Sequence, residues 1–350
     1  MIQADSNIKH QKQKPIPVTL IGGFLGAGKT SLLNHVLSEN HGVRAAVLVN
    51  DFGAVNIDAK LVVGVEGETV SLANGCICCT IRDDLIGACL GLLKRPEAPE
   101  HLLIELSGVS DPVPVLNTFM ETELGALFSL SSTLAVVDAE QFPRMEREMS
   151  DLVHVQIAAA DMVVINKVDR VSLDALAGIK KQVSAMGQGS GVIEVSYGRV
   201  PLELIFETDS RSFETWRQDS VQGGGKHVQA HAFSTWYWTS DRPLSLPGLR
   251  SVLGILPEGV YRAKGILCFE ELPVNRYVLQ LVGRRYTIDE TGRWGPELPR
   301  SEVVLIGARG GIDAKVLQSS FDRCIGTGDE SNSPLLKLSK RLFQDEQTSN

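Results

Sequence analysis

Gly23–Thr30, which reads GFLGAGKT, fits the phosphate-loop pattern G-x-x-x-x-G-K-[ST] at every fixed position. The apolar run Pro17–Ile21 before it is typical of a buried strand, and Ser31–Leu37 after it carries apolar residues at helical spacing. Glycines let successive backbone N–H groups turn toward a phosphate without a Cβ in the way. Strand, glycine loop and helix in this order predict a nucleotide phosphate site rather than a glycine-rich turn that only opens a helix.

The side chains of this loop suggest how a nucleotide is held. Lys29 is expected to reach the β- and γ-phosphates, and the hydroxyl of Thr30 is expected to bind Mg²⁺. The predicted nucleotide contacts in the loop are Gly23, Gly26, Ala27, Gly28, Lys29, Thr30 and Ser31.

The composition of the 350-residue chain is that of an ordinary globular protein of about two domains, with 43% hydrophobic and 22% charged residues. A net charge of −8 argues against a nucleic-acid partner, because no basic surplus exists to neutralise phosphates. No apolar run approaches the roughly 20 residues of a membrane span. Residues 1–14 are polar and lack the core of a secretory signal. We therefore expect a cytoplasmic protein with a disordered tail over 1–14 and no membrane partner.

Strand-like and helix-like stretches alternate over residues 15–208. Most of the strand-like stretches are near-continuous apolar runs, as expected when helices cover both faces of a parallel sheet. We predict a P-loop NTPase domain over 15–208, an α/β fold with a doubly wound and mostly parallel sheet. The predicted strands are Ile16–Ile21, Arg44–Val49, His101–Glu105, Thr133–Val137, Asp161–Ile165 and Val192–Val195.

Carboxylates follow two of these strands, at the sheet edge where ligands of such folds bind. Asp51 lies in the loop Asn50–Asp58, and Glu105 ends the strand His101–Glu105. Both are expected to hold Mg²⁺ or order the attacking water, so that Lys29, Asp51 and Glu105 form the predicted catalytic set. A solvated loop without a catalytic role is the alternative for Asn50–Asp58.

Three of the six cysteines, Cys76, Cys78 and Cys79, fall within four positions. Thiolates are soft ligands that suit Zn²⁺ or Cu(I), and the Asn74-Gly75 turn signal lets the chain curl around one ion. Three protein ligands leave a fourth position open, which favours a transfer or catalytic site over a structural one. Buried core cysteines are the alternative for this motif, and they are the prediction for Cys89, Cys268 and Cys324.

Asn166-Lys167-Val168-Asp169 follows the predicted strand Asp161–Ile165 and has the pattern of a guanine reader. The Asp169 carboxylate accepts from the N1–H and the exocyclic amine of guanine, which adenine does not offer together. Asn166 is expected to shape the contacts to the base edge, and the Lys167 stem to pack on the ring. Ser196, after the last predicted strand, is placed to complete the base pocket.

The remaining chain changes character twice. Residues 209–228 include Gly223-Gly224-Gly225 and predict a domain linker. Residues 229–325 predict a smaller α+β domain with an antiparallel sheet, and residues 326–350 a polar tail. Its predicted elements are strands at His231–Trp238, Tyr261–Phe269, Arg276–Val282 and Val303–Ile306, and helices at Leu244–Leu256 and Asp313–Phe321.

With these motifs in order, the chain resembles the CobW family of metal-trafficking GTPases, relatives of the GTPases that insert nickel into urease and hydrogenase. The likeness rests on five motifs and covers about residues 15–321. These motifs are the phosphate loop Gly23–Thr30, Asn50–Gly53, Gly75–Cys79, Glu105–Gly108 with Asp111-Pro112, and Asn166–Asp169. The C-terminal strand His231–Trp238 and Arg262–Gly265 add to it.

The resemblance implies a GTP-hydrolysing metallochaperone that uses GTP/GDP and Mg²⁺. Its cargo would be Zn²⁺, or Co²⁺ as in some members, held at Cys76, Cys78 and Cys79 and delivered to a client metalloprotein. A second copy of the chain, in a dimer that depends on nucleotide or metal, is the other candidate partner. Two alternatives stay open: a zinc sensor or sink with incidental hydrolysis, and a cobalt-handling accessory of the cobalamin pathway.

Overall fold

The computed structural model describes residues 15–49, 69–71, 80–121, 123–187, 189–206, 233–257, 259–295, 298–308 and 310–326. Asp51 and the three clustered cysteines Cys76, Cys78 and Cys79 lie outside these ranges, as do the predicted linker, the tail 1–14 and all but the first residue of the tail 326–350. Within the described ranges, no helix is long and apolar enough to cross a bilayer.

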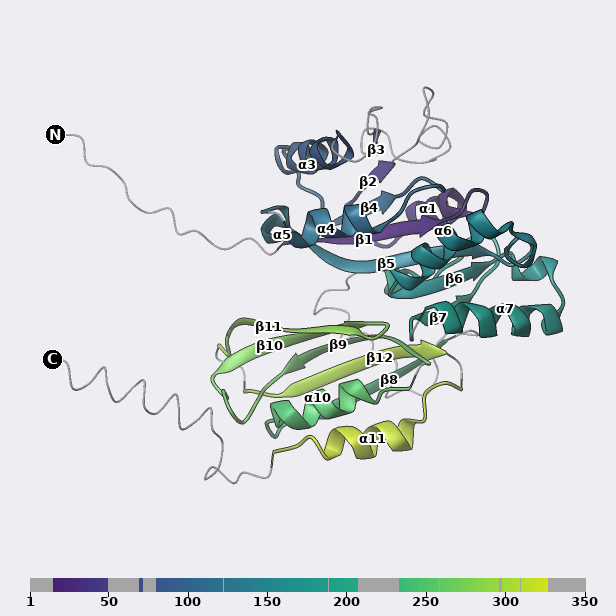
Figure 1. Ribbon diagram of the computed structural model, residues 1–350. Helices are drawn as coiled ribbons and strands as arrows, with labels where there is room; N and C mark the ends of the chain where they lie inside the picture. The colour runs from purple at the N-terminus through teal and green to yellow at the C-terminus, as the bar shows by residue number, and fades with distance from the viewer. Residues whose placement is uncertain are drawn as a thin grey trace, which may run out of the picture.

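A seven-stranded parallel sheet forms the amino-terminal half, in the order β3-β2-β4-β1-β5-β6-β7 (Figure 1). Its strands are β1 (Ile16–Gly23), β2 (Ala45–Val49), β3 (Thr69–Ser71), β4 (His101–Glu105), β5 (Phe128–Asp138), β6 (Met162–Asn166) and β7 (Gly191–Glu194). β1 is the central strand, so the phosphate loop that follows it begins in the middle of the sheet. The predicted doubly wound α/β fold is confirmed.

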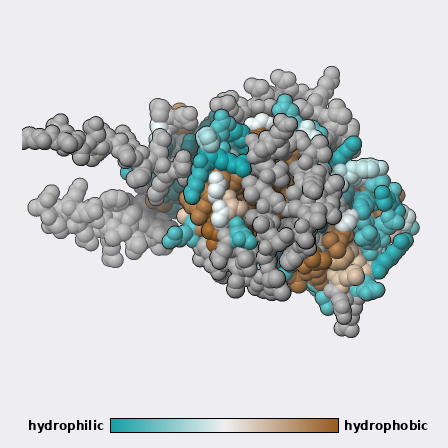
Figure 2. All heavy atoms as spheres, turned by 90° about the horizontal axis from the view of Figure 1, so that it is seen from above, coloured by the Kyte–Doolittle hydropathy of each residue, from teal (hydrophilic) through white to brown (hydrophobic). Residues whose placement is uncertain are grey.

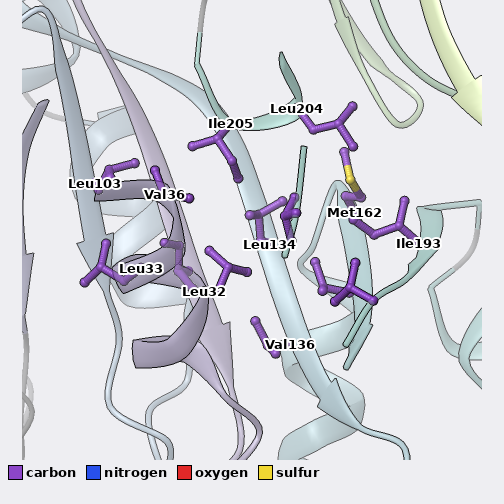
Figure 3. Packing of buried hydrophobic residues seen from close by; sticks show 14 of the residues in the cluster. Leu32, Leu33, Val36, Leu103, Leu134, Val136, Met162, Ile193, Leu204 and Ile205 are labelled. Carbon is purple, nitrogen blue, oxygen red and sulfur yellow. The ribbon is translucent and has the colours of Figure 1, made fainter. Parts of the chain in front are cut away.

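Alternation along the strands explains the two buried faces. In β5, Leu134 and Val136 belong to one apolar cluster while Ala135 and Val137 belong to another. The first face is covered by α1 and α8, and Figure 3 shows Leu32, Leu33 and Val36 of α1 beside the strand residues Leu103 and Leu134. The opposite face is covered by α3, α4, α6 and α7. These helices, with the short α5, are α1 (Lys29–Ser38), α3 (Thr80–Leu93), α4 (Val113–Glu121), α5 (Leu124–Leu127), α6 (Arg147–Ala158), α7 (Leu173–Met186) and α8 (Leu202–Ile205).

The carboxyl-terminal half is built on a five-stranded antiparallel sheet in the order β11-β10-β9-β12-β8. Two helices pack on it, and Figure 1 shows both along one side of the sheet. The elements are β8 (Phe233–Ser240), α10 (Leu246–Gly254), β9 (Val260–Leu267), β10 (Asn275–Val282), β11 (Arg285–Arg293), β12 (Ser301–Ala308) and α11 (Ala314–Asp322). Trp236 and Trp238 pack against Phe321 of α11, with ring centroids 5.2 and 5.4 Å apart. The predicted antiparallel α+β unit is confirmed.

Two strands, β3 and β11, were not among the predicted ones, and each case has a physical reason. β3 is only three residues long, too short to show a period. β11 pairs along its whole length with β10 but is largely exposed, and its apolar alternation is confined to Tyr286 and Ile288, which is too short to mark a half-buried strand. β5 begins five residues before its predicted start, because Ser129, Ser131 and Ser132 are polar although the strand there is partly or fully buried.

The two halves meet at the amino ends of β6 and β7. Arg285 of β11 donates from Nε to Asp161 Oδ1 at 3.0 Å and from Nη2 to Oδ2 at 2.7 Å. The Tyr261 hydroxyl donates to the Val192 carbonyl at 2.8 Å. Tyr261, Val282 and Ile306 also join the apolar cluster that α1 covers elsewhere. The second half therefore covers part of the first sheet, where a doubly wound fold would otherwise need another helix.

The Asp161–Arg285 pair predicts a stability change that depends on pH. Burial raises the pKa of Asp161, while Arg285 and the Thr133 N–H act in the opposite direction. Arg285→Ala should raise this pKa further, because the carboxylate loses its cation. When the pKa of a carboxyl group is raised in the folded state, the free energy of unfolding increases as the pH falls through that pKa. We expect a loss of about 1–3 kcal/mol at pH 7 and a smaller loss at pH 5.

Urea unfolding at both pH values measures this difference. Arg293→Ala removes an exposed arginine of the same strand and should change the unfolding free energy by less than about 0.5 kcal/mol. Equal losses at pH 7 and pH 5 in the Arg285→Ala protein would show that Asp161 does not depend on this cation.

Candidate nucleotide site

The phosphate loop needs glycine at the two fixed motif positions, Gly23 and Gly28, and favours it at Gly26 between them. Gly23, Gly26 and Gly28 have φ angles of 133°, 74° and 103°, a region that other residues rarely adopt. Space is also limiting, because a Cβ on Gly23 would lie 2.2 Å from the Val136 carbonyl oxygen and one on Gly28 would lie 2.2 Å from Asn166 Nδ2. The motif glycines are therefore fixed by conformation and by close neighbours.

The loop leads directly into α1, which begins at Lys29 with Gly28 as its N-cap. No side chain caps this end and no acidic residue lies in the first turn. A helix start of this kind presents backbone N–H groups and the positive end of the helix dipole to an anion. Lys29 is only 6% exposed, and its Nζ donates to the Phe24 carbonyl at 3.3 Å, so the ammonium lies over the loop.

Two of the predicted magnesium residues come together. The Thr30 hydroxyl donates to Glu105 Oε1 at 2.9 Å, although the two residues are 75 positions apart. Glu105 ends β4, which pairs with β1 so that Ile21 lies opposite Glu105. A hydroxyl oxygen and a carboxylate oxygen are the donors that Mg²⁺ prefers, so these residues fit the ion. Asp51 follows β2, the other neighbour of β4, but lies outside the described residues.

Asn166 connects the phosphate loop to the predicted base pocket. It ends β6 and is 1% exposed. Its Nδ2 donates to the Ala27 carbonyl at 2.9 Å, and its Oδ1 accepts from the Gly198 N–H at 3.0 Å. The amide is thus engaged with two backbone segments, so we infer that Asn166 shapes the base pocket by holding its walls together.

Lys167 crosses the phosphate loop. Its backbone is left-handed, with φ of 62°, and its Nζ donates to the Gly26 carbonyl at 2.7 Å and to Asp138 Oδ2 at 2.6 Å. Asp169 lies in the short 3-10 turn Val168–Arg170 with its side chain exposed, and Ser196 is partly buried just after β7. The predicted guanine-reading residues are therefore at the carboxyl ends of β6 and β7.

Sequence reasoning missed two contributors to this site. Asp138 ends β5 and directly follows the predicted strand Thr133–Val137, so the rule that singled out Glu105 would also have found it. Gly108 is the second, since the sequence named it only as the end of the motif Glu105–Gly108 and gave it no role. A Cβ there would lie 2.7 Å from the Leu25 backbone nitrogen, so the loop after β4 supports the phosphate loop from outside. A steric contact of this kind leaves no pattern in the sequence.

The cysteines separate into two groups. Cys89, Cys268 and Cys324 are buried, as predicted for core residues. Burial raises the pKa of Cys89 to about 12 and that of Cys324 to about 11, so these groups stay protonated and are poor metal ligands at neutral pH. Among the residues that the structure describes, no three His, Cys, Asp or Glu side chains cluster so as to hold a metal.

The described surface carries both polar and apolar areas. Figure 2, which views the molecule from above, shows teal areas and two brown ones. Large apolar side chains remain exposed at Leu25 of the phosphate loop, at 54%, and at Val109 after β4, at 48%. The rim of the predicted phosphate site is therefore partly apolar.

Comparison with known proteins gives the family. The family model described as CobW/HypB/UreG, nucleotide-binding domain, matches residues 17–194. The chain belongs to this family. A second model, described as the cobalamin synthesis protein cobW C-terminal domain, matches residues 233–325. The nucleotide-binding domain of the CobW/HypB/UreG family thus carries both the phosphate loop and Asn166–Asp169.

Two relatives and one crystal structure illustrate the likeness. Zinc chaperone YjiA of Escherichia coli strain K12 is 32% identical over 306 residues, which cover 84% of this chain and 94% of the relative. Zinc-regulated GTPase metalloprotein activator 1 of Dictyostelium discoideum is 29% identical over 344 residues, covering 84% and 72%. The crystal structure of Zn(II)-bound YjiA GTPase from E. coli aligns with 26% identity and a TM-score of 0.42, covering 89% and 100%.

The Gly108–Leu25 contact predicts a local effect on nucleotide binding. Gly108→Ala should displace the phosphate loop, because the new methyl group meets backbone atoms that cannot swing away. We expect at least a ~10-fold loss of affinity for a fluorescent guanine nucleotide, equivalent to about 1.4 kcal/mol.

Gly178→Ala is the matched control, since Gly178 lies inside α7 with no atom within 4 Å of a new Cβ. This change should leave binding intact and stabilise the helix by about 0.5–1 kcal/mol. Equal affinities for the two variants would mean that the loop after β4 does not support the phosphate loop.

Proposed function

We propose that the protein is a GTPase metallochaperone, which binds a transition metal, zinc first among them, and delivers it to a client protein as its nucleotide state changes. The observation that carries the GTPase assignment is the Asn166 amide, which joins the phosphate loop at Ala27 to the turn at Gly198. A guanine-reading motif and a phosphate motif that share one side chain are arranged to bind one molecule. The names of the relatives supply the proposal of zinc.

For hydrolysis, we assign the following roles to this chain. Lys29 and the backbone N–H groups at the start of α1 hold the phosphates and stabilise negative charge that develops during transfer. Thr30 and Glu105 would hold Mg²⁺, which supplies positive charge at the phosphates when bound. Asp51 and Glu105 orient the attacking water. In-line transfer needs positioning and charge stabilisation rather than a covalent intermediate, and these residues provide both.

Base selection is assigned to the residues after β6 and β7. The exposed Asp169 carboxylate accepts two hydrogen bonds that guanine donates and adenine does not. Lys167, fixed over the loop at Gly26, presents its aliphatic stem to the ring, and Ser196 borders the pocket.

The metal is cargo in this proposal, and we assign it to Cys76, Cys78 and Cys79. Three thiolates suit Zn²⁺ and leave one coordination position for a ligand of the client. The motif lies in the chain between β3 and α3, within the domain that we place at 15–208 and ahead of the second domain at 229–325.

The first prediction of this proposal concerns hydrolysis. Lys29→Ala should lower the single-turnover rate of GTP hydrolysis by about 100-fold or more, because a buried ammonium next to the loop is removed from the developing charge. Lys181→Ala, an exposed lysine of α7, should hydrolyse GTP like the wild type. A Lys29→Ala rate within a few-fold of the wild-type rate would contradict the assignment.

The second concerns the base. Asp169→Asn should weaken the binding of GTP and strengthen the binding of xanthosine triphosphate. The new amide donates to the 2-oxo group that xanthine carries in place of the amine. Competition binding measures the ratio of the two affinities, with Asp174→Asn, an exposed acid of α7, as control. A variant that keeps the wild-type preference for GTP would remove Asp169 as the reader.

The third prediction tests the chaperone function itself. The triphosphate form should bind zinc more tightly and the diphosphate form should release zinc, since a carrier must release its metal after GTP hydrolysis, its irreversible step. Such couplings are typically about 1–3 kcal/mol, or roughly 5–150-fold in affinity. Zinc must then tighten the binding of the triphosphate analogue by the same factor. Zinc affinity is measured by chelator competition at fixed pH, because thiolate binding releases protons.

Two variants locate the effect. Replacing Cys76, Cys78 and Cys79 with Ser should abolish tight zinc binding, whereas Cys268→Ala, at a buried cysteine just after β9, should not. Equal zinc affinities with a non-hydrolysable GTP analogue and with GDP would favour a zinc sink whose hydrolysis is incidental.

A further inference from the structure

Asp138 is a buried acid beside the nucleotide site without an assigned role. It ends β5 and is 2% exposed. Its Oδ1 accepts from the backbone N–H groups of Glu140 at 2.8 Å and Gln141 at 3.2 Å, and its Oδ2 accepts from Lys167 Nζ at 2.6 Å. Both oxygens are therefore engaged, one with the following turn and one with the lysine of the guanine-reading motif.

The ion pair between Asp138 and Lys167 fixes the position of the lysine side chain. Lys167 has four rotatable bonds, so ordering its side chain costs rotamer entropy. Its Nζ meets Asp138 Oδ2 on one side and the Gly26 carbonyl on the other, so the ammonium is held at the phosphate loop. The backbone of Lys167 is left-handed, which aims the stem across the loop. The acid therefore holds the end of the stem that is farthest from the strand.

We propose that Asp138 is a positioning residue for nucleotide recognition, which fixes the Lys167 stem across the phosphate loop as one wall of the base pocket while Asp169 reads the base edge. This inference rests on the proposed role of Asn166–Asp169 in binding guanine. It predicts that Asp138 governs how tightly a guanine nucleotide is held and leaves the choice of base to Asp169.

Strand order separates this role from that of a magnesium ligand. β1 carries the phosphate loop and lies between β4 and β5, so Glu105 and Asp138 end the two strands that flank it. The Thr30 hydroxyl bonds to Glu105, on one flank. On the other flank, Asp138 already has a cationic partner in Lys167. The two strand-end carboxylates thus serve different parts of the nucleotide.

The central experiment compares Asp138→Asn with the wild type in binding GDP, GTP, xanthosine triphosphate and ATP, with and without Mg²⁺. We expect GDP and GTP to bind about 5- to 50-fold more weakly, with the preference for GTP over the other triphosphates unchanged. The loss for GDP should be the same in EDTA as in Mg²⁺. Glu105→Gln is the matched comparison, because its loss should require Mg²⁺.

A double-mutant cycle with Lys167→Gln tests whether Asp138 acts through the lysine. In the Lys167→Gln background, Asp138→Asn should cause less than a two-fold further loss, whereas independent residues would multiply their effects. Circular dichroism and thermal unfolding without nucleotide verify the fold of each variant. If Asp138→Asn does not fold, Lys167→Gln alone must weaken GDP and GTP equally and keep the preference for GTP.

The other outcomes overturn the inference in distinguishable ways. A loss that disappears in EDTA would make Asp138 a magnesium ligand, and an altered base preference would make it a reader. Multiplied effects in the cycle, or unchanged affinity, would show that Asp138 does not act through Lys167. One further pair of results separates this inference from the proposed function. If Asp169→Asn prefers xanthosine triphosphate while Asp138→Asn behaves like the wild type, the inference is wrong and the proposed function stands.

Discussion

The Asn166 carboxamide bonds to two segments that lie far apart in the chain, the phosphate loop at Ala27 and the turn at Gly198. Both bonds are buried, so removing the amide would leave a backbone carbonyl and a backbone N–H without partners, at a cost of about 1–3 kcal/mol for each. Asn166 can reach both because β6 ends beside β5, with Asp138 opposite Asn166 in the parallel register. The geometry of the whole site depends on this register.

The same register explains why polar residues collect at one edge. Parallel strands end in the same direction, so the residues that follow β1, β4, β5 and β6 meet although they are spread along the chain. Gly28 has to be glycine because the Asn166 amide occupies the space of a Cβ. The glycine that the motif pattern requires at position 28 and the packing of Asn166 beside it are therefore one constraint.

Much of this could be predicted from the sequence, and the limits have physical causes. The central strands were predictable because buried parallel strands are continuous apolar runs, and Thr30 and Glu105 because a motif and a strand end placed them at one edge. β11 was not, since it is largely exposed and only Tyr286 and Ile288 alternate with its polar residues. Nor was the contact of Arg285 with Asp161, which joins residues 124 positions apart. The roles of Asp51 and of Cys76, Cys78 and Cys79 stay predictions.

The packing of the indole rings on α11 has an optical consequence. The chain has four tryptophans, none before Trp216, and the three in the described ranges, Trp236, Trp238 and Trp294, all belong to the second sheet and its connections. Trp238 Nε1 donates to Asp322, and Trp294 Nε1 to the Asn275 carbonyl. The intrinsic fluorescence of these three indoles therefore reports the second half of the molecule. A nucleotide-dependent change in the emission of these three indoles would show that the two halves communicate, and the contacts of Tyr261 and Arg285 are one described route between them.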